Sequence, residues 1–261
     1  MATVTQHAPG TFNWPELLAA DAEAAKKFYS ALFGWTITSQ DMGEHGMYHI
    51  FQLAGRDCAA MFQLSPEMSA GGVPPHWGAY VTVESADEAA RRAVELGGKL
   101  VMGPFDVNEN GRCAFLTDPV GAAFSVWQAK NHIGIAACGE PGALAWVQLN
   151  ASDPAKAKPF YTALLGWKAN DMPDPSTGGE YTMFMKADGP AGGMMAMPPG
   201  VDAPSHWLQY FGAADVQATH DKALSLGAKS YVKPTEIPGM GWFAVLADPG
   251  GAVFALATAK G

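Results

Sequence analysis

Apolar residues at helical spacing predict an α-helix early in the chain, between Asp21 and Gly34. The residues that define its apolar face are Ala25, Phe28, Tyr29 and Leu32. Their spacing of three and four positions places them on one side of a helix. Asp21 is suited to cap the first turn, and Gly34 can adopt the left-handed conformation that ends many helices. We therefore expect a helix that packs on a neighbouring layer through this face.

Short apolar segments on either side of this helix predict β-strands. They are residues 12–19 before the helix and residues 47–53 and 59–64 after it. The pattern then restarts with an apolar strand, a capping box from Ser85 to Glu88 and a second helix that ends at Gly97. The strands of this second part are residues 77–83, 100–102, 112–117 and 122–127. Each part is therefore a β-α-β-β-β module.

The whole pattern occurs twice in the chain. Residues 28–35 (FYSALFGW) recur as residues 160–167 (FYTALLGW), 132 positions later. Further on, His76 and its neighbours recur at His206, 130 positions later. Each copy of such a repeat must be a self-similar folding unit. The chain therefore contains four modules, and the predicted fold class is α+β.

The composition argues against several classes of protein. A formal net charge of −9, without any run of Lys and Arg, disfavours a nucleic-acid or anionic membrane surface. No segment approaches the roughly 18 apolar residues of a membrane span, and the first residues lack the pattern of a secretory signal. Three widely spaced cysteines, Cys58, Cys113 and Cys138, are typical of a cytosolic protein. We expect a cytoplasmic protein whose partner is a small molecule.

The combined pattern resembles the vicinal oxygen chelate superfamily, which includes glyoxalase I, bleomycin- and fosfomycin-resistance proteins and extradiol dioxygenases. The resemblance rests on the strand leading to Asp21, the helices that end at Gly34 and Gly97, and closing Asp-Pro turns, all present twice. It implies two glyoxalase-like domains with curved mixed sheets and concave cups. The implied domains are residues 9–129 and 141–258, joined by a linker at residues 130–140. The chain is then a monomer with an internal pseudo-twofold axis, or a homodimer.

Enzymes of this family hold a divalent metal in the cup, and the resemblance assigns ligand positions to each domain. In this chain those positions are Trp14, Gly78 and Ser125, and in the second domain Trp146, Leu208 and Ala255. None of these residues is a usual metal ligand. We therefore predict that the cups have no metal cofactor. The alternative moves the ligands by two residues on the same strand face. It nominates Glu16, Gln148, His76 and His206.

Tryptophans at former ligand positions suggest a different use of the cup. Trp14 and Trp146 each offer a flat apolar surface with one hydrogen-bond donor, which suits a planar or hydrophobic ligand. The alternative is that both rings only fill volume. The predicted ligand-binding residues are Trp14, Trp146, Gln148, His76, Tyr80 and Tyr210.

Acid–base chemistry without a metal needs a carboxylate or a histidine in the cup. Glu16 is the only carboxylate on either opening strand, and the candidate catalytic residues are Glu16 and His206. They face each other only if the first module shares a cup with the fourth, as in single-domain relatives whose cups combine two chains. Dioxygenases instead pair the modules of one domain, and a linker of about ten residues could span either arrangement.

The leading hypothesis is a metal-independent protein of the glyoxalase/bleomycin-resistance type that binds a small molecule. The alternative is a lyase or isomerase acting on a small carbonyl compound, with Glu16 and His206 or a non-standard metal site. Four further histidines are expected at the surface. They are His45, His49, His132 and His220.

Overall fold

The computed structural model describes residues 4–43, 46–174 and 178–258. The first domain comprises β1 (Phe12–Ala19), α1 (Ala22–Phe33), β2 (Thr36–Asp41), β3 (Met47–Leu53), β4 (Arg56–Gln63), α2 (Pro66–Ala70), β5 (His76–Thr82), α3 (Ala86–Glu95), β6 (Lys99–Val107), β7 (Gly111–Thr117) and β8 (Ala123–Ala129). The second comprises β9 (Leu144–Ala151), α4 (Pro154–Leu165), β10 (Lys168–Pro173), β11 (Glu180–Lys186), β12 (Gly189–Ala196), β13 (His206–Ala213), α5 (Val216–Ser225), β14 (Lys229–Ile237), β15 (Gly241–Ala247) and β16 (Val253–Thr258).

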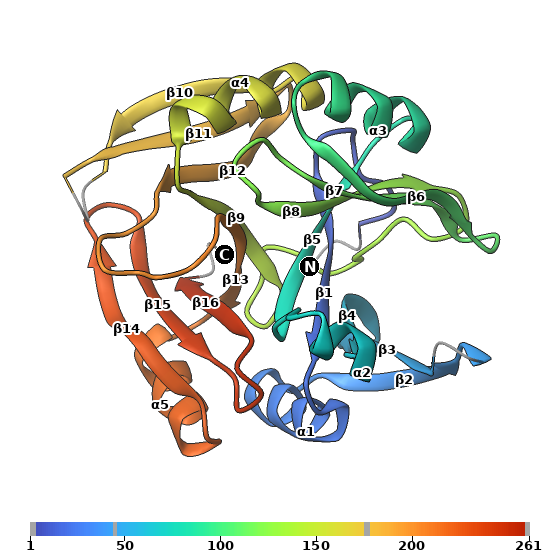
Figure 1. Cartoon of the computed structure of the whole chain (residues 1–261). Helices are drawn as coiled ribbons and strands as arrows, with labels where there is room; N and C mark the ends of the chain where they lie inside the picture. The colour runs from blue at the N-terminus through green and yellow to red at the C-terminus, as the bar shows by residue number, and fades with distance from the viewer. Residues whose placement is uncertain (1–3, 44–45, 175–177, 259–261) are drawn as a thin grey trace.

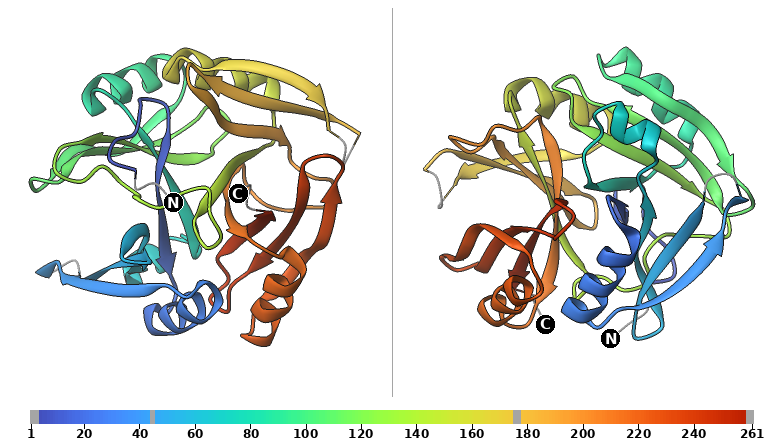
Figure 2. Two further views of the ribbon diagram at one scale, coloured as in Figure 1. Left: turned by 180° about the vertical axis from the view of Figure 1, so that it is seen from behind. Right: turned by 60° about the horizontal axis from the view of Figure 1, so that its bottom comes forward.

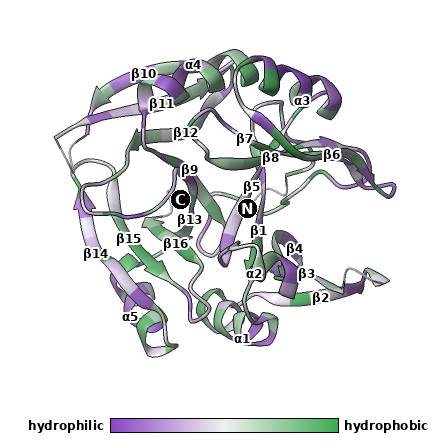
Figure 3. Ribbon diagram, viewed as in Figure 1, coloured by the Kyte–Doolittle hydropathy of each residue, from purple (hydrophilic) through white to green (hydrophobic). Residues whose placement is uncertain are grey.

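Each domain is built on one eight-stranded mixed sheet (Figure 1). The strand order is β2-β3-β4-β1-β5-β8-β7-β6 in the first sheet, and the second repeats it as β10-β11-β12-β9-β13-β16-β15-β14. The helices mix hydrophilic and hydrophobic residues, as amphipathic covering helices do (Figure 3). The α+β class and the duplication are therefore confirmed.

Local signals place the first helix correctly. The side chain of Asp21 accepts a hydrogen bond from the backbone N–H of Ala24 at 3.0 Å, and Gly34 adopts the left-handed conformation with φ of 74°. The apolar face of α1 is buried, with Tyr29 fully inaccessible to solvent. No helix in the described ranges is both long and apolar enough to cross a membrane.

Modules of the same domain form each sheet. β1 pairs antiparallel with β5, which places Glu16 opposite Gly78, and β9 pairs in the same way with β13. The arrangement in which the first module shares a cup with the fourth is therefore wrong. The connection between β4 and β5 contains α2 and leads into the strand that pairs with β1, so the second module extends the sheet that the first module began.

The two domains pack through the faces that carry the helices, as the two views of Figure 2 also show. The hydroxyl of Tyr29 on α1 donates to Asp248 at 2.9 Å, and Tyr161 on α4 donates reciprocally to Asp118 at 3.0 Å. Both carboxylates belong to the Asp-Pro turns, so those turns join the domains. The first module does meet the fourth, but on the side opposite the cups.

Two tryptophans add a second pair of reciprocal contacts. The indole N–H of Trp35 donates to the carbonyl of Gly142 at 2.7 Å, and that of Trp167 donates to the carbonyl of Gly10 at 3.0 Å. The partners are related by the repeat spacing of 132 residues. The contacts thus obey the internal pseudo-twofold relation.

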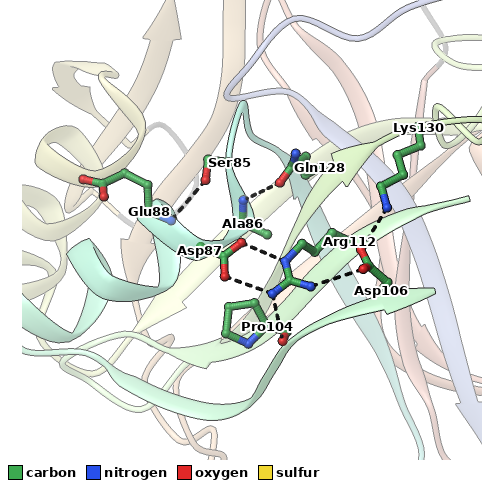
Figure 4. Close-up of polar contacts among 9 residues, drawn as sticks. All are labelled: Ser85, Ala86, Asp87, Glu88, Pro104, Asp106, Arg112, Gln128 and Lys130. Atoms are coloured by element: carbon green, nitrogen blue, oxygen red, sulfur yellow. Dashed lines mark hydrogen bonds and ion pairs between the residues drawn. The ribbon is translucent and has the colours of Figure 1, made fainter. Parts of the chain in front are cut away.

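An exposed ion network holds α3 against the outer hairpin of the first sheet (Figure 4). Arg112 on β7 donates to Asp87 on α3 at 2.7 Å and lies 3.5 Å from Asp106 on β6. Lys130 also contacts Asp106, at 3.0 Å. Such exposed pairs contribute little to stability, and position 242, which corresponds to 112, is a tryptophan.

The sequence pattern missed the edge strands β2 and β10 and the short helix α2. An edge strand has neighbours on one side only, so it needs few apolar residues. All but one of the residues of β2 are exposed. Its polar sequence therefore carried no strand signal.

Candidate functional site in the first domain

The face of β1 opposite α1 carries the candidate residues. Leu17 and Ala19 belong to the apolar cluster that contains the buried face of α1. Side chains alternate along a strand, so Trp14 and Glu16 point to the other side of the sheet. We call that side of the first sheet the first cup, and the corresponding side of the second sheet the second cup.

A chain of hydrogen bonds occupies the centre of the first cup. The indole N–H of Trp14 donates to the hydroxyl of Tyr48 at 2.9 Å. Tyr48 in turn donates to one oxygen of Glu16 at 2.6 Å, and Tyr80 donates to the other at 2.7 Å. Both carboxylate oxygens therefore accept a hydrogen bond from a tyrosine. The central strands β1 and β5 and the strand β3 position these groups.

Burial controls the electrostatics of this network. Glu16 is 5% exposed, and burial raises the pKa of its carboxyl, while the donors Tyr48, Tyr80 and Trp14 lower it in part. Burial and the negative charge of Glu16 raise the pKa of Tyr48 and Tyr80 well above the usual range. Both tyrosines therefore keep their protons and remain donors at neutral pH.

The residues beside Glu16 on the cup face are small. Gly78 lies opposite Glu16 on β5, and Ala60 lies beside it on β4. A Cβ atom added to Gly78 would meet only the backbone oxygen of Glu16, at 3.5 Å, and no side chain within 4 Å. The first 4 Å above Gly78 on the cup face are therefore free of side chains other than those of its two chain neighbours. We call this space, next to the Glu16 carboxyl group, the Gly78 notch.

The linker between the domains contributes to the same cup. The ring of His132 packs edge-on against Trp14, with 4.6 Å between ring centroids, and its carbonyl accepts a hydrogen bond from Trp127 at 2.8 Å. Its Nε2 atom lies 3.6 Å from a carboxylate oxygen of Asp57. Burial lowers the pKa of His132, and the charge of Asp57 opposes this shift. His132 was expected at the surface; its side chain is 26% exposed, and the rest is covered because the linker packs on the sheet.

Two of the other histidines also differ from expectation. His49 and His220 are each 4% exposed, so they are not surface residues. His49 accepts or donates a hydrogen bond with Ser39 at 2.8 Å, and His220 does so with Ser230 at 2.9 Å. A serine on the neighbouring strand thus satisfies one ring nitrogen of each histidine, which allows both rings to be buried. His45 lies outside the described residues.

The second cup keeps the aromatic pair but changes the carboxylate. Trp146 donates to Tyr181 at 2.9 Å, as Trp14 does to Tyr48. Gln148, at the position of Glu16, instead donates to Asn150 at 2.9 Å. Asn150 then contacts Nε2 of His206 at 3.2 Å. Gln148, Asn150 and His206 therefore form a hydrogen-bonded series that contains no carboxylate.

The second cup has a large side chain at the position where the first has Gly78. Leu208 occupies the position of Gly78 and is 4% exposed. Gly193 lies beside Gln148, and a Cβ atom there would collide with the hydroxyl of Tyr181. Tyr181 thus covers the remaining small residue. The second cup has no counterpart of the Gly78 notch.

A buried carboxylate near the second cup escaped the sequence analysis. Asp174 follows β10 and is 4% exposed. Burial and the charge of Asp174 raise the pKa of Tyr181 to about 12. Burial and the neighbouring Tyr181 and Asp174 raise the pKa of Tyr210 as well. Asp174 lies after an edge strand that the sequence pattern did not reveal, so nothing linked it to the cup.

The structure separates the two candidate catalytic residues. Glu16 lies on β1 in the first sheet, and His206 begins β13 in the second. Their hydrogen-bond partners differ as well, so the expectation that they face each other is wrong. His206 and its counterpart His76 each contact the carbonyl of the proline two residues earlier at 2.8 Å. The sequence analysis named Tyr80 but missed Tyr48, which no motif distinguished.

The cups do not offer a donor set for a divalent metal. The first cup has one carboxylate, Glu16, and both of its oxygens accept from tyrosines. The family positions hold Trp14, Gly78 and Ser125, which lack good donors. Within residues 4–43, 46–174 and 178–258, no three His, Cys, Asp or Glu side chains are grouped so as to hold a metal ion. The residues present therefore do not fit the metal of the family enzymes.

Comparison with known proteins agrees with the fold. The family model of the Glyoxalase/Bleomycin resistance protein/Dioxygenase superfamily matches residues 11–126 and 143–256. The chain belongs to this superfamily. It is 39% identical over 254 residues to "Putative glyoxylase CFP32" of Mycobacterium tuberculosis, covering 97% of this chain and 96% of that one. It is 32% identical over 268 residues to "Anthracycline biosynthesis protein DnrV" of Streptomyces peucetius, covering 97% and 94%.

Solved structures show the same fold at low identity. A Mn(II)-bound glyoxalase from Novosphingobium aromaticivorans has a TM-score of 0.66 at 15% identity, covering 96% of this chain and 82% of that one. The 2,3-dioxygenase LapB from Pseudomonas sp. KL28 has a TM-score of 0.66 at 14% identity, covering 99% and 93%. Family membership thus fixes the architecture, and the chemistry has to be argued from the cups.

Proposed function

We propose that this protein binds a small molecule with a planar or hydrophobic body in the first cup, without a metal ion. The observation that carries the proposal is the buried Glu16 carboxylate, fixed by two tyrosines and lying beside the open Gly78 notch. Trp14, which is 7% exposed and donates to Tyr48, lies next to it on the same strand face. A few fixed polar groups in an otherwise apolar concave face are the usual composition of a ligand site.

The relatives support a small organic ligand. One relative is named a glyoxylase and another an anthracycline biosynthesis protein. The net charge of −9 also favours a small molecule over nucleic acid. The superfamily supplies the cup, while the residues of this chain replace the metal with aromatic and carboxylic groups.

A fluorescence and thermal-shift screen with planar aromatic fragments tests the proposal. A fragment that binds in the first cup should quench the emission of Trp14 and raise the melting temperature through mass action. The substitution Trp14→Phe should reduce the quenching and weaken the thermal shift. Trp242→Phe is the matched control, because Trp242 is 46% exposed on β15 and lies outside both cups.

Two results would count against the proposal. One is a panel in which no fragment changes either signal in protein treated with a chelator. The other is a response that Trp242→Phe reduces and Trp14→Phe leaves intact. The same screen repeated with Zn, Mn, Ni and Fe salts shows whether a metal is required for the response.

A second candidate is a lyase or isomerase that acts on a small carbonyl compound. The raised pKa of Glu16 favours it, because burial moves a carboxyl towards the pH at which a general base works best. His206 takes no part, since it lies in the other sheet. Replacing Glu16 with Gln should then abolish turnover of a substrate that the variant still binds. Unchanged turnover would show that Glu16 is not the base, and a wild-type protein that turns over no carbonyl compound would leave binding as the function.

A further inference from the structure

The hydrogen-bond donors of the first cup are all in use. Trp14 donates to Tyr48, and both Tyr48 and Tyr80 donate to Glu16. A tyrosine hydroxyl has one proton, so neither can donate to a ligand as well. What remains are acceptor sites on the carboxylate oxygens and on the hydroxyl of Tyr80. A ligand in the Gly78 notch must therefore bring its own donor.

The negative charge of Glu16 has no cationic partner in the described part of the chain. The influences on its carboxyl are burial and three neutral donors, Tyr48, Tyr80 and Trp14. Burying a charge without a counter-charge is costly. A positively charged group in the notch would remove that cost, whereas a neutral donor would remove only part of it.

Aromatic residues form the next cross-strand pair along β1 and β5, Trp14 with Tyr80, while Leu18 and His76 form the pair on the other side of Glu16. Tyr48 also flanks Glu16, and Tyr80 packs near Phe115 with 6.0 Å between ring centroids. The faces of aromatic rings attract cations, most strongly where water is excluded. Carboxylate and rings together favour an organic cation over a metal ion, because the apolar rings supply no ligand atoms.

We propose that the ligand of the first cup presents a protonated amine to Glu16, while its apolar body extends over the Gly78 notch. The inference rests on the proposed function and adds the chemical class of the ligand. The amine donates hydrogen bonds to the free acceptor sites of the carboxylate. The bound pair has no net charge, because the positive charge of the ligand compensates the buried negative charge of Glu16.

The second cup supplies the internal comparison. The duplication has placed Gln148 where the first cup has Glu16, and Leu208 where it has Gly78. At these two positions the second cup therefore has neither a carboxylate nor a glycine, and its own buried carboxylate, Asp174, follows β10 instead. Each difference can be transferred to the first cup by one substitution, Glu16→Gln or Gly78→Leu.

Three probes with one shared ring system separate charge from shape. They are 1-naphthylmethylamine, a cation near neutral pH, the neutral 1-naphthylmethanol, and the anion of 1-naphthoic acid. Calorimetric titration should show the amine binding at least about tenfold more tightly than the alcohol, because hydrogen bonds to charged groups are the stronger class. The acid should bind most weakly, since its charge repels Glu16.

Substitutions at Glu16 and Gly78 test whether the preference for the amine and the binding of the probes depend on these two residues. Glu16→Gln should reduce the preference for the amine over the alcohol to within about twofold, because only the charge has been removed. Gly78→Leu should abolish binding of all three probes by filling the notch. Glu236→Gln, which removes an exposed carboxylate on β14, should leave every affinity unchanged. Circular dichroism and melting temperatures establish that each variant is folded.

The outcomes distinguish this inference from the proposed function. If the alcohol or the acid binds as tightly as the amine, the inference is wrong and binding in the cup stands. A preference for the amine that survives Glu16→Gln also overturns it. If no probe binds the wild-type protein, the inference is wrong. If the screen of planar fragments also finds no ligand, the proposed function is wrong as well.

Discussion

At the scale of single residues, Glu16 distinguishes the two cups most clearly. Its twin Gln148 occupies the same place on an equivalent strand, yet donates to Asn150 rather than accepting from tyrosines. One oxygen exchanged for an amide nitrogen thus reverses the polarity of the group. The tyrosine and tryptophan partners persist in both copies, so the change at Glu16 alters the carboxylate and leaves its aromatic neighbours in place.

The raised pKa of Glu16 predicts a pH-dependent stability. The folded protein holds this proton more tightly than the unfolded chain, so the contribution of Glu16 is greatest below its ordinary pKa near 4.5 and falls as pH rises through the folded value. Glu16→Gln removes this titration. The free energy of unfolding of the variant, relative to wild type, should increase as pH rises above about 4.5, by at most about 1.4 kcal/mol per unit. Urea denaturation across this range measures it, and a pH-independent difference would contradict the assignment.

Gln209 predicts a stabilising substitution. It is 1% exposed between the domains, and neither its amide nitrogen nor its oxygen has a hydrogen-bond partner in the described residues. Its surroundings are apolar and include Phe12 and Val147. Gln209→Met keeps the size and removes the unpaired groups, so the free energy of unfolding should rise by about 1–2 kcal/mol. Gln148→Met, which breaks a buried hydrogen bond, should lower it in the same thermal denaturation assay. A destabilised Gln209→Met protein would show that the amide is paired.

At the scale of elements, the linker at residues 130–140 is part of the first domain's structure. The backbone N–H of Ile135 donates to the carbonyl of Asn13 at 2.7 Å, and that of Ala136 donates to Asp57 at 2.7 Å. These bonds tie it to the starts of β1 and β4. The other end of the linker contacts the second domain, where the backbone N–H of Gly139 donates to the carbonyl of Leu144 at the start of β9 at 2.8 Å.

Two glycines of the linker test this packing. Gly134 and Gly139 both have positive φ, at 105° and 71°, but a Cβ atom on Gly134 would collide with the carbonyl of Asn13, whereas one on Gly139 would meet nothing within 4 Å. Gly139→Ala should lower the free energy of unfolding by about 1 kcal/mol, through the backbone alone. Gly134→Ala should cost about 2–4 kcal/mol, because strain and collision add. Equal losses in urea denaturation would mean that the linker does not pack as described.

The sequence predicts those helices and strands whose ends and faces are determined by residues close together in the chain. Asp21 and Gly34 bound the first helix correctly, since caps depend on a few neighbouring residues. The pairing of modules was not predictable, because both arrangements use the same strands and the linker can span either. For the same reason, the sequence named Glu16 and Tyr80 but missed Tyr48 and His132, which reach the cup through strand order and linker packing.

At the scale of the whole molecule, reciprocal contacts unite the two domains. Tyr29 with Asp248 and Tyr161 with Asp118 are buried pairs that cross between them. We therefore expect one cooperative unfolding transition by calorimetry. Tyr29→Phe and Tyr161→Phe should each lower the free energy of unfolding by about 1–3 kcal/mol, since each leaves a buried acceptor short of a donor. Two separate transitions in the wild-type protein would contradict the description of the interface.

Duplication has given this chain two cups that no longer match. The first combines a buried carboxylate with the Gly78 notch, and the second replaces both with Gln148 and Leu208. The central claim is therefore that one cup per chain binds a ligand and that no metal takes part. Calorimetric titration of chelator-treated protein with 1-naphthylmethylamine tests it most directly. We predict about one molecule bound per chain, with binding lost in Gly78→Leu; two molecules per chain, or binding that appears only after a divalent metal is added, would contradict the account.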